Sequence, residues 1–194
     1  MSRRRMLDAY KVGAQIGNYA DLAVLPLDVD PQITLSRNWI DQPFYHIFAE
    51  DTVLAAMSGD TVIRMQMSSV NTIRLGLGDH VYIPAGTPHR IEPREEGILL
   101  RYVAEDAGLE AAAWFCDTCG EELYRLEWQH DNDVEPPRVY AAACARFNAE
   151  ADARTCLRCG TTAAPIDLDA LGWGAYLTED VAPSPREAVD APSG

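Results

Sequence analysis

Positive charge is scarce in this sequence, and long apolar runs are missing from it. Its 194 residues contain 16 Lys and Arg against 30 Asp and Glu, which gives a formal net charge of −14. Nucleic acids and anionic membrane surfaces repel such an acidic protein, so we expect neither as a partner. No apolar run reaches the roughly 18–20 residues that a membrane-spanning helix needs.

The sequence also lacks the marks of an exported, disulfide-linked protein. The basic first six residues resemble the charged part of a signal peptide, but residues 7–11 are too polar for its apolar core. Four of the five cysteines lie in two close pairs, a spacing that suggests a metal site rather than a disulfide framework. We therefore expect a soluble cytoplasmic protein.

The composition changes along the chain and suggests four parts. Residues 1–30 form a helical lead-in, and residues 31–105 consist of short β-type runs between turn signals. Residues 106–172 are richer in Ala, Glu and Arg, and we expect helical stretches beside the cysteine pairs. Residues 173–194 are rich in Pro, Ala, Ser and Asp, which is typical of a mobile tail.

The β-rich region predicts a sandwich or barrel, because its short strands alternate with turns. The expected strands are residues 33–35, 52–57, 61–67, 71–75, 80–83 and 98–103. A glycine turn at Gly78 precedes the β-rich run His80–Ile83, and Pro84 and Gly86 force a second turn that aims His89 at the interior. This G-x5-P-x-G-x2-H spacing resembles the second metal-binding motif of the cupin superfamily. The resemblance implies an all-β core with a cupin double-stranded β-helix barrel.

Two Cys-x2-Cys-Gly units predict a metal site after the barrel. One tight turn presents both sulfurs of a unit to the same ion, and the following glycine supplies the permissive backbone. Four sulfurs form a closed tetrahedral shell suited to zinc or a single iron, so the site is structural or electron-transferring. A redox dithiol pair is the alternative. The predicted ligands are Cys116, Cys119, Cys156 and Cys159.

A cupin barrel followed by these units resembles the bacterial 3-hydroxyanthranilate 3,4-dioxygenases. The resemblance covers roughly residues 31–162 and includes Trp114-Phe115 before the first cysteine and Tyr124–Glu127. It implies Fe²⁺ in the barrel, an aminophenol-like aromatic substrate, O₂ as co-substrate, a homodimer, and a rubredoxin-like four-cysteine module apart from the chemistry.

The family holds its barrel iron with His, Glu and a second His. The histidines correspond to His46 and His89, but the Glu corresponds to Thr52. A neutral hydroxyl is a poor substitute for a carboxylate, so iron is expected to bind more weakly. The neighbouring Glu50 or Asp51 could take the third place if the chain bends there.

The substrate-binding residues of the family have changed as well. Its two arginines correspond to Gln42 and Pro93, and one glutamate corresponds to Ala104. Gln cannot replace the charge with which an arginine grips a carboxylate, so the usual substrate is not expected to be preferred. The remaining candidates for substrate contacts are Gln42, Arg90, Arg94, Arg101 and Glu105.

Three hypotheses follow from the sequence. The first is an iron-dependent oxygenase acting on an aminophenol-like aromatic. The second is a divergent cupin enzyme with other chemistry at a two-histidine or metal-free pocket. The third is a non-catalytic binding protein that has lost the metal. Retention of His46 and His89 favours the first two, and the changes at Thr52 and Gln42 favour the last two.

Overall fold

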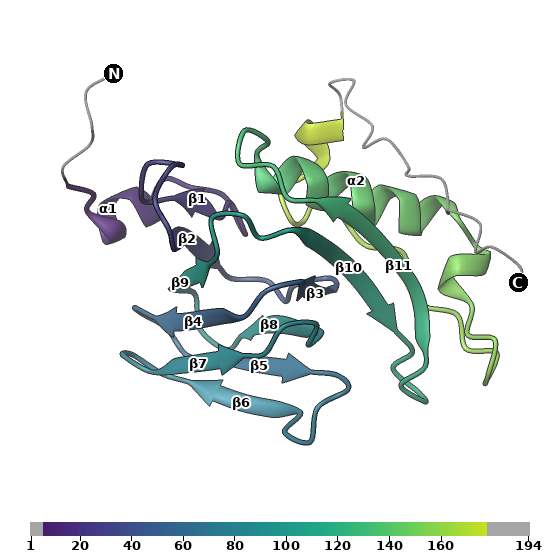
Figure 1. Cartoon of the computed structure of the whole chain (residues 1–194). Coiled ribbons are helices and arrows are strands. Elements are labelled where there is room, and N and C mark those ends of the chain that lie inside the picture. Colours follow the sequence, from purple (N-terminus) through teal and green to yellow (C-terminus); the bar gives the residue numbers. More distant parts are fainter. Residues whose placement is uncertain (1–5, 178–194) are drawn as a thin grey trace, which may run out of the picture.

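The computed structural model describes residues 6–177, which form two antiparallel β-sheets with helices beside them (Figure 1). The first sheet has the strand order β1–β2–β9–β4–β7. Their bounds are Leu22–Ala23, Gln32–Asn38, Gly97–Val103, Thr52–Ala56 and His80–Ile83. The second sheet has the order β11–β10–β3–β8–β5–β6. Their bounds are Glu122–Gln129, Leu109–Phe115, Tyr45–Phe48, His89–Pro93, Thr61–Met65 and Thr72–Leu75.

The strand order defines the type of barrel. The strands β2–β9–β4–β7 lie in one sheet and β3–β8–β5–β6 in the other, so the chain crosses repeatedly between them. Eight strands connected in this way make a jelly roll, the architecture to which cupins belong. The predicted all-β core with a double-stranded β-helix barrel is thus confirmed.

Strand alternation decides which side chains enter the barrel, because successive side chains point to opposite faces. Along β9, Leu99, Arg101 and Val103 share one face and are all buried. The opposite face of this sheet packs on α1 (Ala9–Gly13), where a Cβ at Gly13 would lie 2.6 Å from Ile98 Cδ1. Arg101 therefore projects into the interior from the middle of an apolar row.

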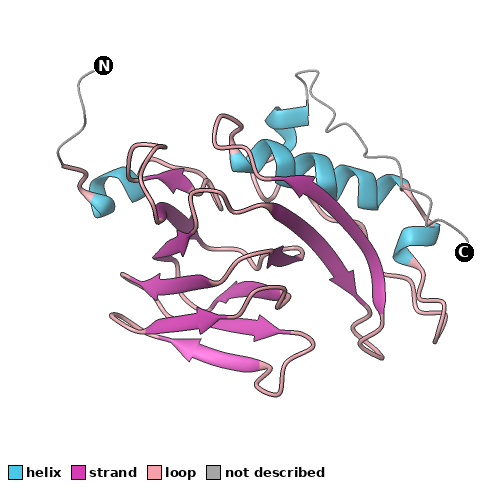
Figure 2. Cartoon of the chain, in the orientation of Figure 1, coloured by secondary structure: helices cyan, strands magenta, loops and turns pink. Residues whose placement is uncertain are grey.

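The strands β10 and β11 extend the second sheet beyond the barrel. The strand β10 pairs with β3 on one side and with β11 on the other. Helix α2 (Pro136–Ala149) covers the extension, and Trp114 stacks on Phe147 with ring centroids 4.5 Å apart. Before the first cysteine pair, Leu109–Phe115 is a strand whose alanines are buried, so the helical stretch expected beside the cysteine pairs is α2, before the second pair (Figure 2).

This extension bears on the predicted division of the chain. The boundary at residue 105 falls in the loop between β9 of the first sheet and β10 of the second, and β10 continues the second barrel sheet by pairing with β3. The division into residues 31–105 and 106–172 stays a prediction.

The C-terminal part of the described chain contains two short 3₁₀ helices, η1 (Asp152–Arg154) and η2 (Gly174–Leu177). Trp173, at the start of the predicted tail, is 1% exposed and donates its indole N–H to the carbonyl of Asn18 at 3.1 Å. The chain is thus anchored at Trp173, and residues 178–194 of the predicted tail lie outside the described residues.

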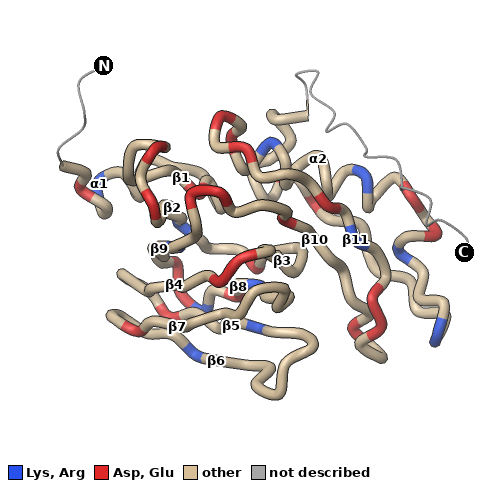
Figure 3. Tube along the Cα trace, in the orientation of Figure 1, with Lys and Arg blue, Asp and Glu red and all other residues tan. Residues whose placement is uncertain are grey.

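Charge is distributed over several loops of the molecule (Figure 3). Acidic residues lie between β3 and β4, between β9 and β10 and before α2. Among residues 6–177, no helix is long and apolar enough to cross a bilayer.

Candidate functional site

Sheet pairing brings His46 and His89 together inside the barrel. His46 lies in β3, His89 begins β8, and the two are direct partners in the antiparallel register. Both are 1% exposed, and their nearly parallel rings have centroids 6.3 Å apart. Gly86, in the turn before His89, has φ 72°, a conformation that favours glycine.

His89 is hydrogen-bonded at both ring nitrogens. Its Nδ1 lies 3.1 Å from the carbonyl of Thr87, and its Nε2 lies 2.8 Å from Nη1 of Arg101. A guanidinium can only donate, so Nε2 accepts and Nδ1 carries the proton. Burial, and then the charge of Arg101, lowers the pKa of His89 well below its usual range. The lone pair that a metal ion would use at Nε2 is therefore directed at Arg101.

His46 contacts a buried carboxylate instead. Its Nε2 lies 2.7 Å from Oε2 of Glu110, the residue of β10 that pairs with Phe48 of β3. A carboxylate only accepts, so Nε2 of His46 carries a proton and donates. Burial, partly opposed by Glu110, lowers the pKa of His46. The Nδ1 atom of His46 is buried without a hydrogen-bond partner.

Glu110 links this interior histidine to a second one near the surface. Its other oxygen accepts a hydrogen bond from Nδ1 of His130, whose Nε2 lies 2.9 Å from Oδ1 of Asn132. Burial favours the neutral acid, but the hydrogen bonds from His130 and His46 outweigh it and lower the pKa of Glu110 to about 2. The hydrogen bond to Glu110 raises the pKa of His130. Although His130 lies in the loop after β11, its side chain is only 20% exposed.

None of the residues predicted for the third iron-ligand place is a buried carboxylate. Thr52 begins β4, is 2% exposed and has a buried hydroxyl without a partner. Glu50 and Asp51 are exposed in the turn between β3 and β4. Asp51 accepts hydrogen bonds from the Tyr82 hydroxyl and the Ala85 backbone N–H, each at 2.8 Å.

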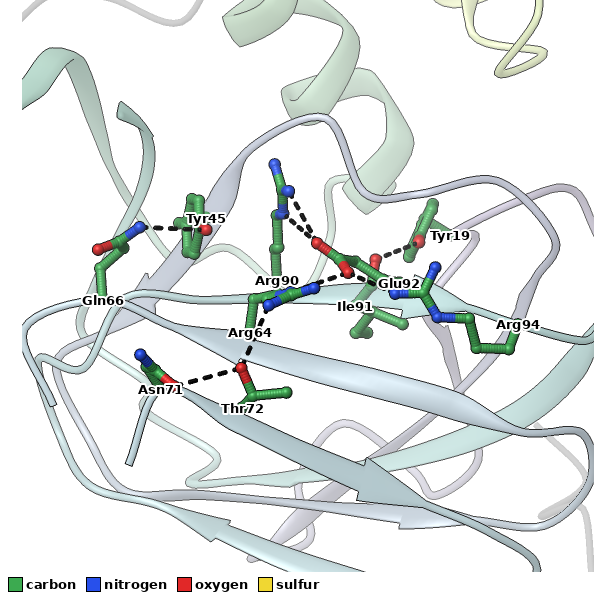
Figure 4. A network of polar contacts seen from close by, with 10 residues as sticks. All are labelled: Tyr19, Tyr45, Arg64, Gln66, Asn71, Thr72, Arg90, Ile91, Glu92 and Arg94. Carbon is green, nitrogen blue, oxygen red and sulfur yellow. Dashed lines mark hydrogen bonds and ion pairs between the residues drawn. The ribbon is translucent and has the colours of Figure 1, made fainter. Parts of the chain in front are cut away.

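The predicted substrate-binding residues separate into two groups. Arg90 and Arg94 bind the carboxylate of Glu92, together with Arg64 (Figure 4). Arg90 and Glu92 project from the face of β8 opposite to His89 and Ile91, because they occupy the alternate positions of that strand. Arg101, from β9, is the one arginine of the predicted set that enters the barrel.

The other two predicted substrate contacts have structural partners. Gln42 is 2% exposed, and its Oε1 accepts the backbone N–H of Ile91 at 3.1 Å, so its amide fixes the start of β3 against β8. Glu105 is exposed in the loop after β9, where its backbone N–H donates to Asp30 at 3.1 Å.

A cavity of about 200 Å³ opens at the end of the barrel, between the first sheet, β10–β11 and α2. Its lining includes Thr34, Phe48, Arg101, Glu110, Trp128 and His130. Asp21 and Tyr140 also line it, and the Tyr140 hydroxyl donates to Asp21 at 2.8 Å. The cavity thus combines aromatic walls with one buried cation and a carboxylate–histidine pair.

Iron does not fit the barrel as the resemblance implies. The Nε2 atoms of His46 and His89 are engaged by Glu110 and Arg101, and the third place carries a hydroxyl. Within residues 6–177, the clusters of three or more His, Cys, Asp or Glu side chains spaced for one ion do not include either histidine. The permanent positive charge of Arg101 next to His89 also opposes a divalent cation.

The four cysteines, in contrast, present their sulfurs to one another. All four Sγ atoms lie within 4.8 Å, and the Cys116–Cys159 and Cys119–Cys156 pairs are each 3.5 Å apart. Tetrahedral zinc with bonds of about 2.3 Å would place its sulfurs about 3.8 Å apart. Both units fold alike: Gly120 and Gly160 have φ 74° and 75°, and each donates its N–H to the first cysteine of its unit at 2.8 Å. The donor set fits a tetrahedral metal ion.

Glu110 and His130 were missed by sequence reasoning, and Arg101 was placed only through the resemblance. The alternation Leu99–Arg101–Val103 in a predicted strand could have shown that Arg101 points inward. No local signal marks Glu110 or His130, because the register of β10 with β3 and β11 brings them to the cavity.

The topology places the chain among the cupin-type jelly rolls, and comparison with known proteins adds relatives of one activity. No family model matches the chain. The 3-hydroxyanthranilate 3,4-dioxygenases of Bacillus thuringiensis (strain Al Hakam) and Bacillus cereus (strain 03BB102) are each 25% identical to it over 121 residues. The match covers 60% of this chain, which spans 65% of the length of these curated relatives.

Solved structures with a similar outline include a hydroquinone 1,2-dioxygenase from Sphingomonas sp. TTNP3. It is 15% identical, covers 50% of this chain and 72% of that one, and has a TM-score of 0.45. A cupin-2 domain protein from Shewanella frigidimarina NCIMB 400 is 17% identical, with coverage of 51% and 94% and a TM-score of 0.44.

Proposed function

We propose that this chain is a cupin enzyme that performs acid–base chemistry on a small aromatic compound in the cavity, without iron in the barrel. The observation that carries the proposal is the engagement of both interior imidazoles, His46 by Glu110 and His89 by Arg101. A metal ion would have to displace both partners and would gain no carboxylate at Thr52.

The cavity supplies the parts that such chemistry requires. Phe48 and Trp128 offer aromatic surface for a planar compound. Glu110 and His130 form a hydrogen-bonded pair in which both ring nitrogens of His130 face acceptors, as they do when the ring is protonated. When a bound compound replaces Asn132 at Nε2, a histidine in this state can donate that proton to the compound and recover it from solvent. The activity named for the Bacillus relatives supports an aromatic substrate.

Metal analysis of the purified chain, before and after anaerobic incubation with Fe²⁺, tests the proposal. We expect one metal equivalent per chain, bound by Cys116, Cys119, Cys156 and Cys159 as a structural zinc or iron ion. The variant Cys119→Ser should lose it, whereas Cys144→Ala should keep it, because Cys144 is buried in the core away from the cluster. A second equivalent of iron that depends on His89 would overturn the proposal.

The second candidate is an Fe²⁺-dependent oxygenase with His46 and His89 as ligands and Glu50, Asp51 or water in the third place. The cross-strand pairing of the two histidines favours it. Its substrates would be O₂ and an aminophenol-like aromatic. Oxygen uptake with 3-hydroxyanthranilate and with 2-aminophenol, with and without added Fe²⁺, separates the candidates. Our proposal expects no iron-dependent uptake with either compound.

The proposal also covers the location, the oligomeric state and the partners of the protein. We infer a cytoplasmic homodimer that binds neither nucleic acid nor membranes. The net charge of −14 supports the absence of nucleic-acid and membrane binding. Sedimentation of the full chain tests the dimer.

A further inference from the structure

We propose that Arg101 and Thr34 form a binding site for the carboxylate of a small aromatic acid at the inner end of the cavity. The inference rests on the proposed function only in that the same cavity is used. Two neighbouring polar groups, each with a buried atom that lacks a hydrogen-bond partner, point to it.

The first group is the guanidinium of Arg101. The residue is 5% exposed, lines the cavity and donates from Nη1 to His89, while its Nε is buried without a hydrogen-bond partner. In the described part of the chain, no carboxylate oxygen lies within 4.0 Å of its nitrogens. Arginine keeps its charge at any ordinary pH, and a buried charge without a counter-ion is costly.

The carboxylates that share the cavity are committed elsewhere. Glu110 accepts from His46 and His130, and Asp21 accepts from the Tyr140 hydroxyl. Neither forms an ion pair with Arg101 within the described residues. A bound anion would therefore be the direct partner that the guanidinium lacks.

The second group is the hydroxyl of Thr34. Thr34 of β2 is the register partner of Arg101 in β9, so both side chains project from the same face of the sheet. Its Oγ1 is buried without a partner, and the residue lines the same cavity. A carboxylate has two oxygens, one for an N–H of Arg101 and one for the Thr34 hydroxyl.

The surroundings select an aromatic acid over a small inorganic anion. The Cζ atom of Arg101 lies 4.9 Å from the ring centroid of Phe48, so one face of the guanidinium is covered by an aromatic ring. Trp128 lines the cavity near His46, with ring centroids 5.8 Å apart. A flat hydrophobic body attached to the carboxylate would contact these walls, and phosphate would not.

Isothermal titration of the full chain, with its cysteine site loaded with zinc, tests the site. The probes are benzoate, its neutral counterpart benzyl alcohol, and inorganic phosphate. We expect benzoate to bind at least about 30-fold more tightly than the other two, because an unpaired buried charge typically costs that much or more. Equal affinities for benzoate and benzyl alcohol would overturn the proposal.

Variants locate the binding. Arg101→Gln should weaken benzoate at least about 30-fold and Thr34→Val about 5- to 10-fold, whereas Arg74→Gln should have no effect, because Arg74 pairs with Asp60 at the surface. If Arg101→Gln does not fold, Arg101→Lys replaces it and should weaken benzoate about 10-fold by loss of the fork geometry. Unchanged affinity in Thr34→Val and in the folded Arg101 variant would reject the site. Detection of iron in the barrel would reject the proposed function, but it would not affect the conclusion that the titrations give about the carboxylate site.

Discussion

The barrel interior and the four-cysteine cluster differ in one respect that spacing along the chain does not reveal. In both regions folding brings predicted ligands together. The cysteine sulfurs face one another with no other strong partner, but the Nε2 atoms of His46 and His89 are held by Glu110 and Arg101. Proximity of ligands is therefore insufficient for a metal site, because the lone pairs must also be free and the summed charge must suit a cation.

The largest effect is expected for a variant that removes the metal ion from the four-cysteine cluster. Cys119→Ser should remove about one metal equivalent and lower the free energy of unfolding by at least about 3 kcal/mol, a fraction of the ~10–16 kcal/mol with which zinc binds finger peptides. Elemental analysis and urea unfolding measure the two effects. Unchanged metal content would show that the cluster is a dithiol pair instead.

A converse experiment would give the barrel free metal ligands, which the cysteine cluster already has. The double variant Thr52→Glu with Arg101→Gln supplies a carboxylate and frees the Nε2 lone pair of His89. We expect it to gain about one equivalent of Fe²⁺ when loaded anaerobically. The matched control is Thr52→Glu alone, which should gain much less because Arg101 still engages His89. Equal loading of both variants would contradict the role given to Arg101.

The carboxylate that links the two histidines should matter for stability. Glu110→Gln should cost about 3 kcal/mol at pH 7, because it removes a buried charge that two histidines contact. The folded-state pKa of Glu110 is lowered to about 2, so its contribution is complete above about pH 4.5 and is lost as the pH falls towards 2. The stability difference between wild type and variant should shrink over that range in urea unfolding. The surface variant Glu127→Gln, whose ion pair with Arg125 measures 3.9 Å, should cost under about 0.5 kcal/mol.

The smallest effect concerns His130. Its pKa is raised in the folded state by Glu110, so its contribution is present below about pH 6.5 and is lost as the pH rises through the folded value. His130→Gln should therefore cost about 1–2 kcal/mol at pH 6 and less at pH 9. Urea unfolding of wild type and variant at pH 6 and at pH 9 measures this difference in stability. A difference that grows with pH would contradict the assigned contact.

Much of the barrel could be predicted from the sequence, because its strands carry local signals. The run at residues 80–83 was predicted with its observed bounds, and Gly86 has the positive φ that the predicted turn before His89 requires. The strand β3 was missed because all four of its residues are buried, which leaves no alternation to detect. The strand β10 was not predicted either, because its three alanines are good helix formers and only pairing on both sides overrides that propensity.

The candidate site was predictable to a smaller extent. The histidines and cysteines follow motifs of fixed spacing, and so they were found. Glu110 reaches His46 across 64 positions of sequence, and it does so only through the register of β10 with β3. Such contacts are set by sheet pairing, which no short segment encodes.

The hairpin of β10 and β11 has a consequence for inhibition experiments. One end of β10 leads into Cys116 and the cysteine unit, and the other end carries Glu110, while β11 leads to His130. A chelator that strips the cysteine site would loosen the turn from which both strands extend and would disturb Glu110 and His130 at a distance. Loss of activity in the presence of a chelator would thus be expected of an enzyme with no metal in its active site. Inactivation by chelators has diagnostic value for the barrel only when the hairpin is shown to stay folded.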